Sequence, residues 1–322
     1  MKTQIWISIL LVLLLFGCKQ QTLPPAEQLA SQNGPVKITG AYALYPLTQL
    51  WISEFQKIHP DIKFEIQPIG SGSGLTELMK GNADLSMVSS EVPEDKDSLI
   101  WIAPVARLAT VLIFNSGNPY LKEIIKGGMN RDDLADLFRN DHSKKWGDLF
   151  GKPGKDPVHI YIRSDSSGAT DILARYLWIT AGDIKGTGVN GEDKMIEALK
   201  KDPFALGYCN FIYAFDPKIL RYYSGFRILP LDINNNGKID PKESFYDSIP
   251  SLQRAMWSGK FPCALTRTLS LASKGKPRTK EVVEFLKYIL TDGQKLVADE
   301  GYIELHRSEN RCRVFFLDNV KP

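Results

Sequence analysis

The sequence has few of the residues on which metal binding and covalent catalysis commonly depend. It contains only four histidines and four cysteines among 322 residues, and the cysteines are too far apart for a zinc motif. Neither the G-x-S-x-G nucleophile motif nor the G-x-x-x-x-G-K-[ST] phosphate loop is present. The 40 Lys and Arg residues nearly balance 37 Asp and Glu residues, so no basic excess indicates a nucleic-acid partner.

Long hydrophobic runs are also scarce, and the one at the N-terminus is short. It extends from Ile5 to Phe16, behind Lys2, and ends at Gly17 and Cys18. This length is too small to cross a bilayer comfortably and is typical of an export signal. The last four residues resemble a bacterial lipobox, in which the cysteine carries lipid. We therefore predict a lipoprotein signal peptide over residues 1–18 with Cys18 as the lipid anchor; a free or disulfide-bonded Cys18 is the alternative.

Residues 19–35 show no hydrophobic period and are rich in Gln, Pro, Ser and Ala, which predicts a flexible tether. Three further cysteines follow, and an odd number in an oxidising compartment leaves at least one thiol unpaired within the chain. One disulfide among them is compatible with the sequence, and its pairing stays open: the candidates are Cys209, Cys263 and Cys312.

The folded part is expected to begin near Val36. About 290 residues remain from there, more than one compact core usually holds, so two lobes are expected. Alternating strand and helix patterns predict βαβ units and largely parallel sheets. Ala109–Phe114 is an almost continuous apolar run, as in a strand covered on both faces, and is the candidate first crossing between the lobes.

The sequence pattern of two segments predicts anion-binding sites. Gly70–Gly74 and Ser164–Thr170 each follow a strand pattern and precede a helical one. Small residues let the backbone approach a ligand closely, and the first N–H groups of a helix have no partner within it. Arg163 adds a planar cation beside the second segment. The alternative is a pair of serine-capped helix starts with nothing bound.

Taken in order along the chain, these motifs resemble the phosphate-binding proteins of bacterial ABC importers, from about Val36 to Leu305. The residues that carry the resemblance are Gly40–Leu47, Ile69–Gly74, Asp84–Ser89, Arg163–Thr170, Ala205–Tyr208, Gly293-Gln294 and Gly301-Tyr302. The resemblance implies an α/β, two-lobed periplasmic-binding-protein fold (type II-like). Each lobe would be a mainly parallel sheet flanked by helices, with the ligand cleft between lobes. Lobe I is predicted over residues 36–113 plus 258–322, and lobe II over residues 114–257.

The resemblance also implies the ligand contacts. In that family the anion is held by backbone N–H groups, by hydroxyls at helix starts and by one arginine, which a carboxylate orients. Carried over to this chain, Asp165 is the orienting carboxylate. The phosphate-binding residues are then Leu44, Tyr45, Ser71, Arg163, Ser167, Gly168 and Ala169.

Several positions depart from the family pattern. Ala41 and Tyr42 replace a common hydroxyl residue, and Ala169 replaces a common threonine. Ser90 stands where some relatives place an Asp or Arg, and a carboxylate there would accept a proton from hydrogen phosphate and repel sulfate. Selectivity for phosphate over other tetrahedral oxyanions therefore stays open. We expect Tyr42 to pack on the hinge; the alternative is that it stacks on a ligand larger than phosphate.

The function implied by the resemblance is capture of phosphate or a similar tetrahedral oxyanion and its delivery to an ABC permease. The expected protein is a monomeric lipoprotein of the cell envelope, facing the periplasm or the cell exterior, without enzymatic activity or organic cofactor. One alternative is a phosphatase or serine hydrolase that uses Ser71 or Ser167, although neither motif contains a histidine base. Another is a surface lipoprotein whose cleft binds a different ligand.

A separate motif predicts a structural calcium ion. Asp232–Glu243 has the spacing of an EF-hand loop, with Gly237 at the sharp bend. Pro230 and Pro241 argue against a complete helix–loop–helix, so the ion would brace a loop of lobe II. An Asn-rich surface turn is the alternative. The predicted ligands are Asp232, Asn234, Asn236, the carbonyl of Lys238, Asp240 and Glu243.

Overall fold

The computed structural model describes residues 31, 34–89, 99–140, 144–165, 167–306, 314 and 317. The predicted signal peptide with Cys18, most of the tether, Ser90 and Cys312 lie outside the described residues. None of the described helices is both long and apolar enough to cross a membrane.

Strands alternate with helices along most of the chain. The strands are β1 (Val36–Gly40), β2 (Phe64–Pro68), β3 (Leu85–Val88), β4 (Ile100–Asn115), β5 (His159–Arg163), β6 (Thr187–Val189), β7 (Ala205–Asn210), β8 (Phe215–Asp216), β9 (Arg221–Tyr222), β10 (Phe226–Ile228) and β11 (Thr266–Lys274). The helices are α2 (Tyr45–Gln56), α3 (Ser71–Lys80), α5 (Leu121–Gly127), α6 (Arg131–Asn140), α7 (Trp146–Leu149), α8 (Gly168–Leu177), α9 (Glu192–Lys201), α10 (Ile249–Trp257) and α11 (Lys280–Leu290).

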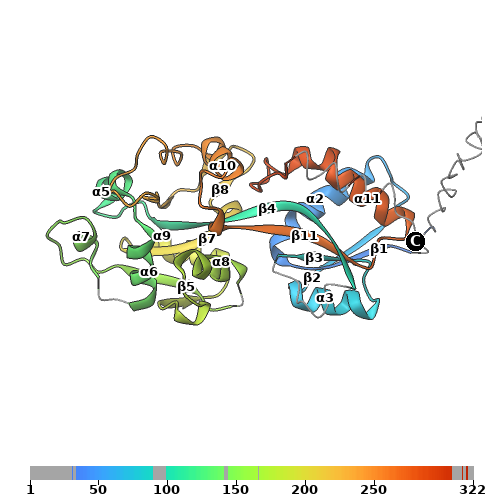
Figure 1. The fold of residues 1–322 in the computed structure, drawn as a ribbon, viewed down its shortest axis with the longest axis horizontal. Coiled ribbons are helices and arrows are strands. Elements are labelled where there is room, and N and C mark those ends of the chain that lie inside the picture. Colours follow the sequence, from blue (N-terminus) through green and yellow to red (C-terminus); the bar gives the residue numbers. More distant parts are fainter. Residues whose placement is uncertain are drawn as a thin grey trace, which may run out of the picture.

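The described strands form one large sheet and a small β8–β9 ribbon. The large sheet has the order β2-β1-β3-β11-β4-β7-β5-β6, with β10 added on β4. The strands toward each end, β2-β1-β3 and β7-β5-β6, pair in parallel. The central strands β11 and β4 pair antiparallel with each other and with their outer neighbours. Figure 1 shows β4 and β11 running from one lobe into the other, so these two strands carry the connection.

The buried residues form two large cores, one in each lobe. The first contains residues of β1, α2, β3, α11 and β4 up to Leu108. The second begins at Ala109 of β4 and contains residues of β5, β7, α8, α9 and α10. On the return path, Leu265 belongs to the second core and Leu269 to the first. The chain therefore passes from the first core to the second between Leu108 and Ala109, a few residues before the predicted lobe boundary at 113/114. It returns to the first core between Leu265 and Leu269, several residues after the predicted boundary at position 258.

Local sequence explains several element boundaries. Pro46 lies in the first turn of α2, where its missing N–H costs no hydrogen bond. Asn130 precedes α6, and its Oδ1 accepts a hydrogen bond from the N–H of Asp133 at 2.9 Å. Helix α3 starts at Ser71, inside the Gly70–Gly74 segment that was expected to precede the helix, because Gly70 makes the turn with a φ of 88°. The Gly-Ser segment is thus the first turn of the helix and not a loop before it.

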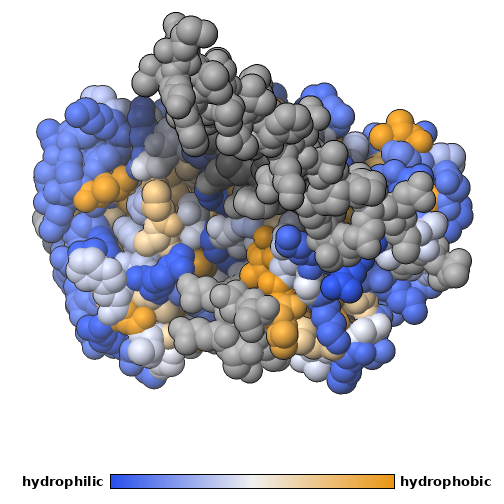
Figure 2. All heavy atoms as spheres, turned by 45° about the vertical axis from the view of Figure 1, so that its right-hand side comes forward, coloured by the Kyte–Doolittle hydropathy of each residue, from blue (hydrophilic) through white to orange (hydrophobic). Residues whose placement is uncertain are grey.

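The face of the molecule shown in Figure 2 is largely hydrophilic, and its hydrophobic patches are small and separate. Isolated apolar side chains of this kind are ordinary on a protein surface.

Candidate functional site

A cleft of about 1370 Å³ is lined by residues from both lobes. Its volume is far larger than one tetrahedral anion, so the lobes stand apart in this structure. Its walls combine glycines, hydroxyl side chains and charged groups, which include Gly70, Ser71, Gly72, Ser73, Ser89, Arg163, Asp165, Ser167, Gly168, Asp171, Glu192, Asn210, Arg267 and Thr268.

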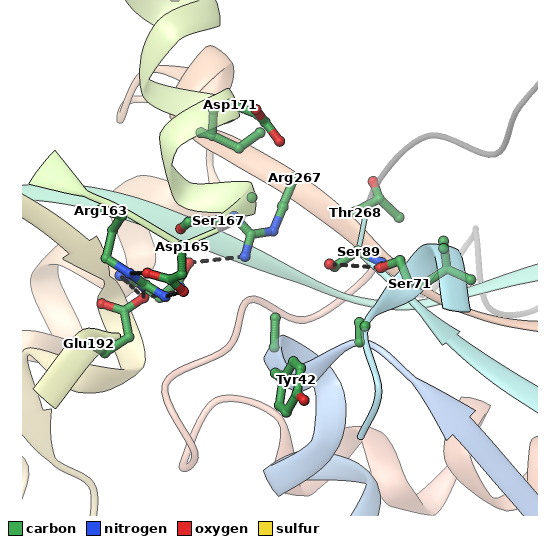
Figure 3. A pocket seen from close by; sticks show the side chains of 18 of the residues that line it. Tyr42, Ser71, Ser89, Arg163, Asp165, Ser167, Asp171, Glu192, Arg267 and Thr268 are labelled. Carbon is green, nitrogen blue, oxygen red and sulfur yellow. Dashed lines mark hydrogen bonds and ion pairs between the residues drawn. The ribbon is translucent and has the colours of Figure 1, made fainter. Parts of the chain in front are cut away.

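The first wall is the N-terminus of α3. Ser71 is its first residue, and the amides of the first turn have no acceptor within the helix. The Ser71 Oγ accepts a hydrogen bond from the Ser89 N–H at 3.1 Å and lies 3.2 Å from the Ser89 hydroxyl (Figure 3). This contact fixes the helix start against the end of β3, so the open amides face the cleft at a defined place.

The second wall is the N-terminus of α8. Ser167 is the N-cap and makes no side-chain capping bond, while its carbonyl accepts from the N–H of Thr170 at 2.9 Å. The Thr170 hydroxyl lies 2.6 Å from the Tyr208 hydroxyl, which also accepts the Arg163 N–H at 3.1 Å. The helix start is thereby fastened to β5 and β7. Its positive end and its first amides provide a second place where an anion is stabilised.

Arg163 lies beside α8 and contacts two carboxylates. Asp165 accepts hydrogen bonds from its Nε at 2.7 Å and its Nη2 at 2.5 Å, and Glu192 lies 2.9 Å from its Nη1. These hydrogen bonds hold the pKa of Asp165 below its usual value, while burial raises the pKa of Glu192. The Arg163–Asp165 pair is the one that the resemblance implies. Its contact with an anion stays a prediction.

Three of the predicted binding residues are not among those that line the cleft: Leu44, Tyr45 and Ala169. Residues Tyr42–Leu44 form a 3-10 turn, in which the Leu44 N–H donates to Ala41 and the Tyr45 N–H donates to Tyr42. In this structure their amides are therefore engaged within the chain. Ala169 is 1% exposed, so its side chain belongs to the core of lobe II.

Tyr42 does not pack on the hinge, so that expectation was wrong. Its side chain is 66% exposed, and it lines the cleft opposite the charged wall (Figure 3). The short 3-10 turn explains the difference, because it buries Leu44 in the core and turns Tyr42 outward.

The sequence reasoning missed Arg267, Glu192 and Asn210, which are all buried at the cleft. The Asn210 amide donates to Glu192 at 2.6 Å and accepts from Arg267 Nη2 at 3.1 Å. One available signal was the pattern of the strand after Thr266, where Arg267 shares its alternation with the apolar Leu269 and Leu271. An arginine on the buried register of a strand indicates a special role.

The side chains of the predicted calcium loop make hydrogen bonds within the loop itself. Asp232 accepts from the N–H groups of Asn236 and Gly237, and Glu243 accepts from those of Ile233, Asn234 and Asp240. The side-chain amides of Asn234 and Asn236 both donate to Asp240. No group of three or more His, Cys, Asp or Glu placed for a metal occurs in the described part of the chain. Calcium binding stays a prediction.

If the loop binds calcium, millimolar calcium added to chelator-treated protein raises the melting temperature. A tenfold excess over Kd gives about 1.4 kcal/mol, or roughly 3–5 °C for a domain of this size. Glu243→Gln should abolish the calcium-induced shift, because position 12 of such a loop supplies the bidentate ligand. Scanning calorimetry with magnesium as the control ion measures this. Equal melting temperatures of the wild type with and without calcium would rule out the site.

The two cysteines that the structure describes are both free thiols. Cys209 is buried in β7, and Cys263 is exposed before β11. Burial raises the pKa of Cys209 well above its usual value, so this thiol is unreactive.

Comparison with known proteins agrees with this architecture. A family model described as the PBP superfamily domain matches residues 25–292. The chain is 25% identical to the phosphate-binding protein PstS of Methanocaldococcus jannaschii, over 81% of this chain and 79% of that protein. It is 26% identical to the phosphate-binding protein PstS of Bacillus subtilis, over 84% and 81%.

Among solved structures, an ABC-type phosphate transport receptor from Vibrio cholerae is similar to this chain. Its TM-score is 0.61 at 16% identity, over 84% of this chain and all of that one. At this identity the likeness shows the fold. It agrees with the family match, which covers most of the sequence. The chain therefore belongs to the PBP superfamily, and its α/β fold of two lobes around a cleft is the fold predicted from the sequence.

Proposed function

We propose that this protein captures phosphate, or a similar tetrahedral oxyanion, in the cleft between its lobes and delivers it to an ABC importer. The observation that carries the proposal is the convergence of the α3 and α8 N-termini with Arg163 and Arg267 on one cleft. Unpaired amides at helix starts and guanidinium groups are the donors that oxyanions prefer. The names of the curated relatives, which are phosphate-binding proteins, support the same ligand class.

The mechanism follows from where the donors lie. Ser71 and its neighbouring amides belong to lobe I, whereas Arg163, Ser167 and Gly168 belong to lobe II. An anion that contacts both sets binds better when the lobes approach, so it favours the closed arrangement over the open one. The strands β4 and β11 connect the lobes, and bending within them would allow the approach (Figure 1).

An enzymatic role finds less support. The Ser71 hydroxyl pairs with Ser89, and Ser167 makes no side-chain capping bond. No histidine is among the described residues that line the cleft, so neither serine has a neutral base beside it. We therefore propose a binding protein without catalytic activity. Nitrophenyl ester and nitrophenyl phosphate assays test this, and turnover that Ser71→Ala or Ser167→Ala removes would overturn it.

The proposal extends to the location of the protein and to its partners. The N-terminal hydrophobic run and Cys18 support export and lipid anchoring at the cell envelope, with the folded domain outside the cytoplasm. A membrane permease would receive the anion from a monomeric receptor. Metabolic labelling with a fatty acid, compared between wild type and Cys18→Ser, tests the anchor; equal labelling would refute it.

Isothermal titration of the domain from Val36 onward with phosphate, sulfate and molybdate tests the central proposal. We expect saturable binding of at least one of these anions with one site per chain. Phosphate is expected to bind, with selectivity over sulfate reduced because Ser90 offers no carboxylate. The absence of heat with all three anions would favour a lipoprotein whose cleft takes another ligand.

A further inference from the structure

Arg267 is a buried cation with unused hydrogen-bond donors. It lies near the start of β11 and is 8% exposed. Its Nη2 donates to Asn210 at 3.1 Å, but its Nε and Nη1 have no hydrogen-bond partner in the described structure. A buried donor without a partner costs free energy, and more so when the group is charged.

The guanidinium also makes no direct ion pair with a described residue. Among the described residues, no carboxylate lies within ion-pair distance of Arg267, whereas Arg163 contacts both Asp165 and Glu192. Burial lowers the pKa of Arg267 to about 10, which still leaves the group charged at neutral pH. Arg163 is paired directly with two carboxylates, whereas Glu192 and Asp171 act on Arg267 only from beyond ion-pair distance and leave its Nε and Nη1 without a hydrogen-bond partner.

The Arg267 guanidinium also contacts a second positive group, the N-terminus of α8. A Cβ built on Gly168 would lie 3.3 Å from the Arg267 Cζ and 3.4 Å from its Nη1, so the guanidinium packs directly against the first residue of α8. A helix N-terminus carries partial positive charge and disfavours a neighbouring cation. Two positive groups in contact, with open donors on both, are stabilised when an anion lies between them.

Figure 3 places Arg267 between the two halves of the site. The Arg163 group with Asp165 and Glu192 lies on one side of it, and Ser71 with Ser89 lies on the other. Arg267 lies on β11, one of the two strands that connect the lobes, and its guanidinium contacts Asn210 and Gly168 of lobe II.

We propose that Arg267 is a second guanidinium that binds the captured oxyanion directly, together with the α8 N-terminus. This inference rests on the proposed function and names a residue that neither the motifs nor the family resemblance assigned. A second cation offsets the donors that the chain lacks at Ala41, Tyr42 and Ala169. It also makes a small oxyanion the expected ligand class, since a second guanidinium then contacts it.

The test compares Arg267→Met and Arg267→Lys with wild type by titration with inorganic phosphate. We expect Arg267→Met to raise Kd at least tenfold, because the charged donors are lost. Arg267→Lys should weaken binding less, since it keeps the charge but loses the planar fork. Arg227→Met is the matched control: Arg227 is an exposed arginine of β10 outside the cleft, and its loss should leave Kd unchanged.

The melting temperature without ligand separates a binding role from a structural one. Removal of a buried charge that has unpartnered donors and no direct ion pair should leave the melting temperature of Arg267→Met equal to or above that of wild type, while its phosphate-induced increase shrinks. Wild-type Kd in either folded Arg267 variant, with Arg163→Met weakened, would overturn this inference alone. If wild type binds no oxyanion, the proposed function fails, and this inference with it.

Discussion

Replacement of Gly74 by alanine is expected to lower the stability of the protein by about 3 kcal/mol, the upper end of the usual cost of overpacking. A Cβ at this position would lie 2.5 Å from the Cα of Gly40 and 2.7 Å from the Oγ of Ser86. The first of these is backbone and cannot rotate away, so α3 must move off β1. For a domain of this size the loss corresponds to roughly 6–12 °C in melting temperature.

Gly72→Ala is the matched control in the same helix. No atom lies within 4 Å of a Cβ at Gly72, and its φ is not positive. Alanine there is expected to stabilise α3 by about 0.5–1 kcal/mol, because it lowers the backbone entropy of the unfolded chain. Scanning calorimetry of both variants measures the contrast. Similar melting temperatures for the two would show that the α3–β1 contact is not tight.

The contact matters because it positions the site. Gly40 has a φ of 120°, and its carbonyl accepts the N–H groups of Ile69 and Gly70 at 2.9 Å each. Only glycine adopts that conformation readily, and only glycine at 74 lets the helix come so close. The two glycines together fix the start of α3 at the end of β1. The open amides near Ser71 are thus held by packing that lies outside the cleft.

Much of this arrangement can be predicted from the local sequence. In α11, Lys280–Leu290, the apolar positions of the sequence repeat with a clear helical period. Ser71, Arg163, Ser167 and Gly168 line one cleft, since both Gly-Ser turns lie at strand ends of an α/β sheet. Such features depend on residues close together in the chain.

The missed features depend on contacts between distant segments. Arg267 meets Asn210 and Gly168 across 57 and 99 positions, and no local pattern reports such a contact. The amides of Leu44 and Tyr45 were assigned to the ligand by resemblance, yet the 3-10 turn engages them. A short turn of this kind is set by how Leu44 packs into the core. Sequence motifs thus located the cleft, and tertiary packing decides which donors face it.

Arg163→Met is expected to raise the Kd for phosphate at least 100-fold. Loss of one partner of a buried, hydrogen-bonded charge pair costs about 2–5 kcal/mol, and here it removes an anion donor as well. Asp165 and Glu192 then remain at the cleft without their common cation, so two carboxylates repel the incoming anion. The variant keeps an apolar stem of similar length, which limits the change to charge and hydrogen bonding.

The repulsion gives the variant its own pH dependence. In the wild type, Arg163 holds the pKa of Asp165 low. Removal of Arg163 lets that pKa rise toward the ordinary value near 4. As the pH is lowered from 7, Glu192, whose pKa burial already raises, gains a proton before Asp165 does. The affinity of Arg163→Met should therefore recover in part, and more than that of wild type, in which Arg163 opposes protonation of Glu192.

A double variant, Arg163→Met with Glu192→Gln, isolates the repulsive contribution. It should bind phosphate more tightly than Arg163→Met at pH 7, because one of the two repelling carboxylates is gone. Titration calorimetry of the three proteins and of Arg227→Met at pH 7 and at lower pH measures the effect. A folded Arg163→Met that binds phosphate like wild type would place the anion away from Arg163. The helix starts and Arg267 would then have to hold it without that guanidinium.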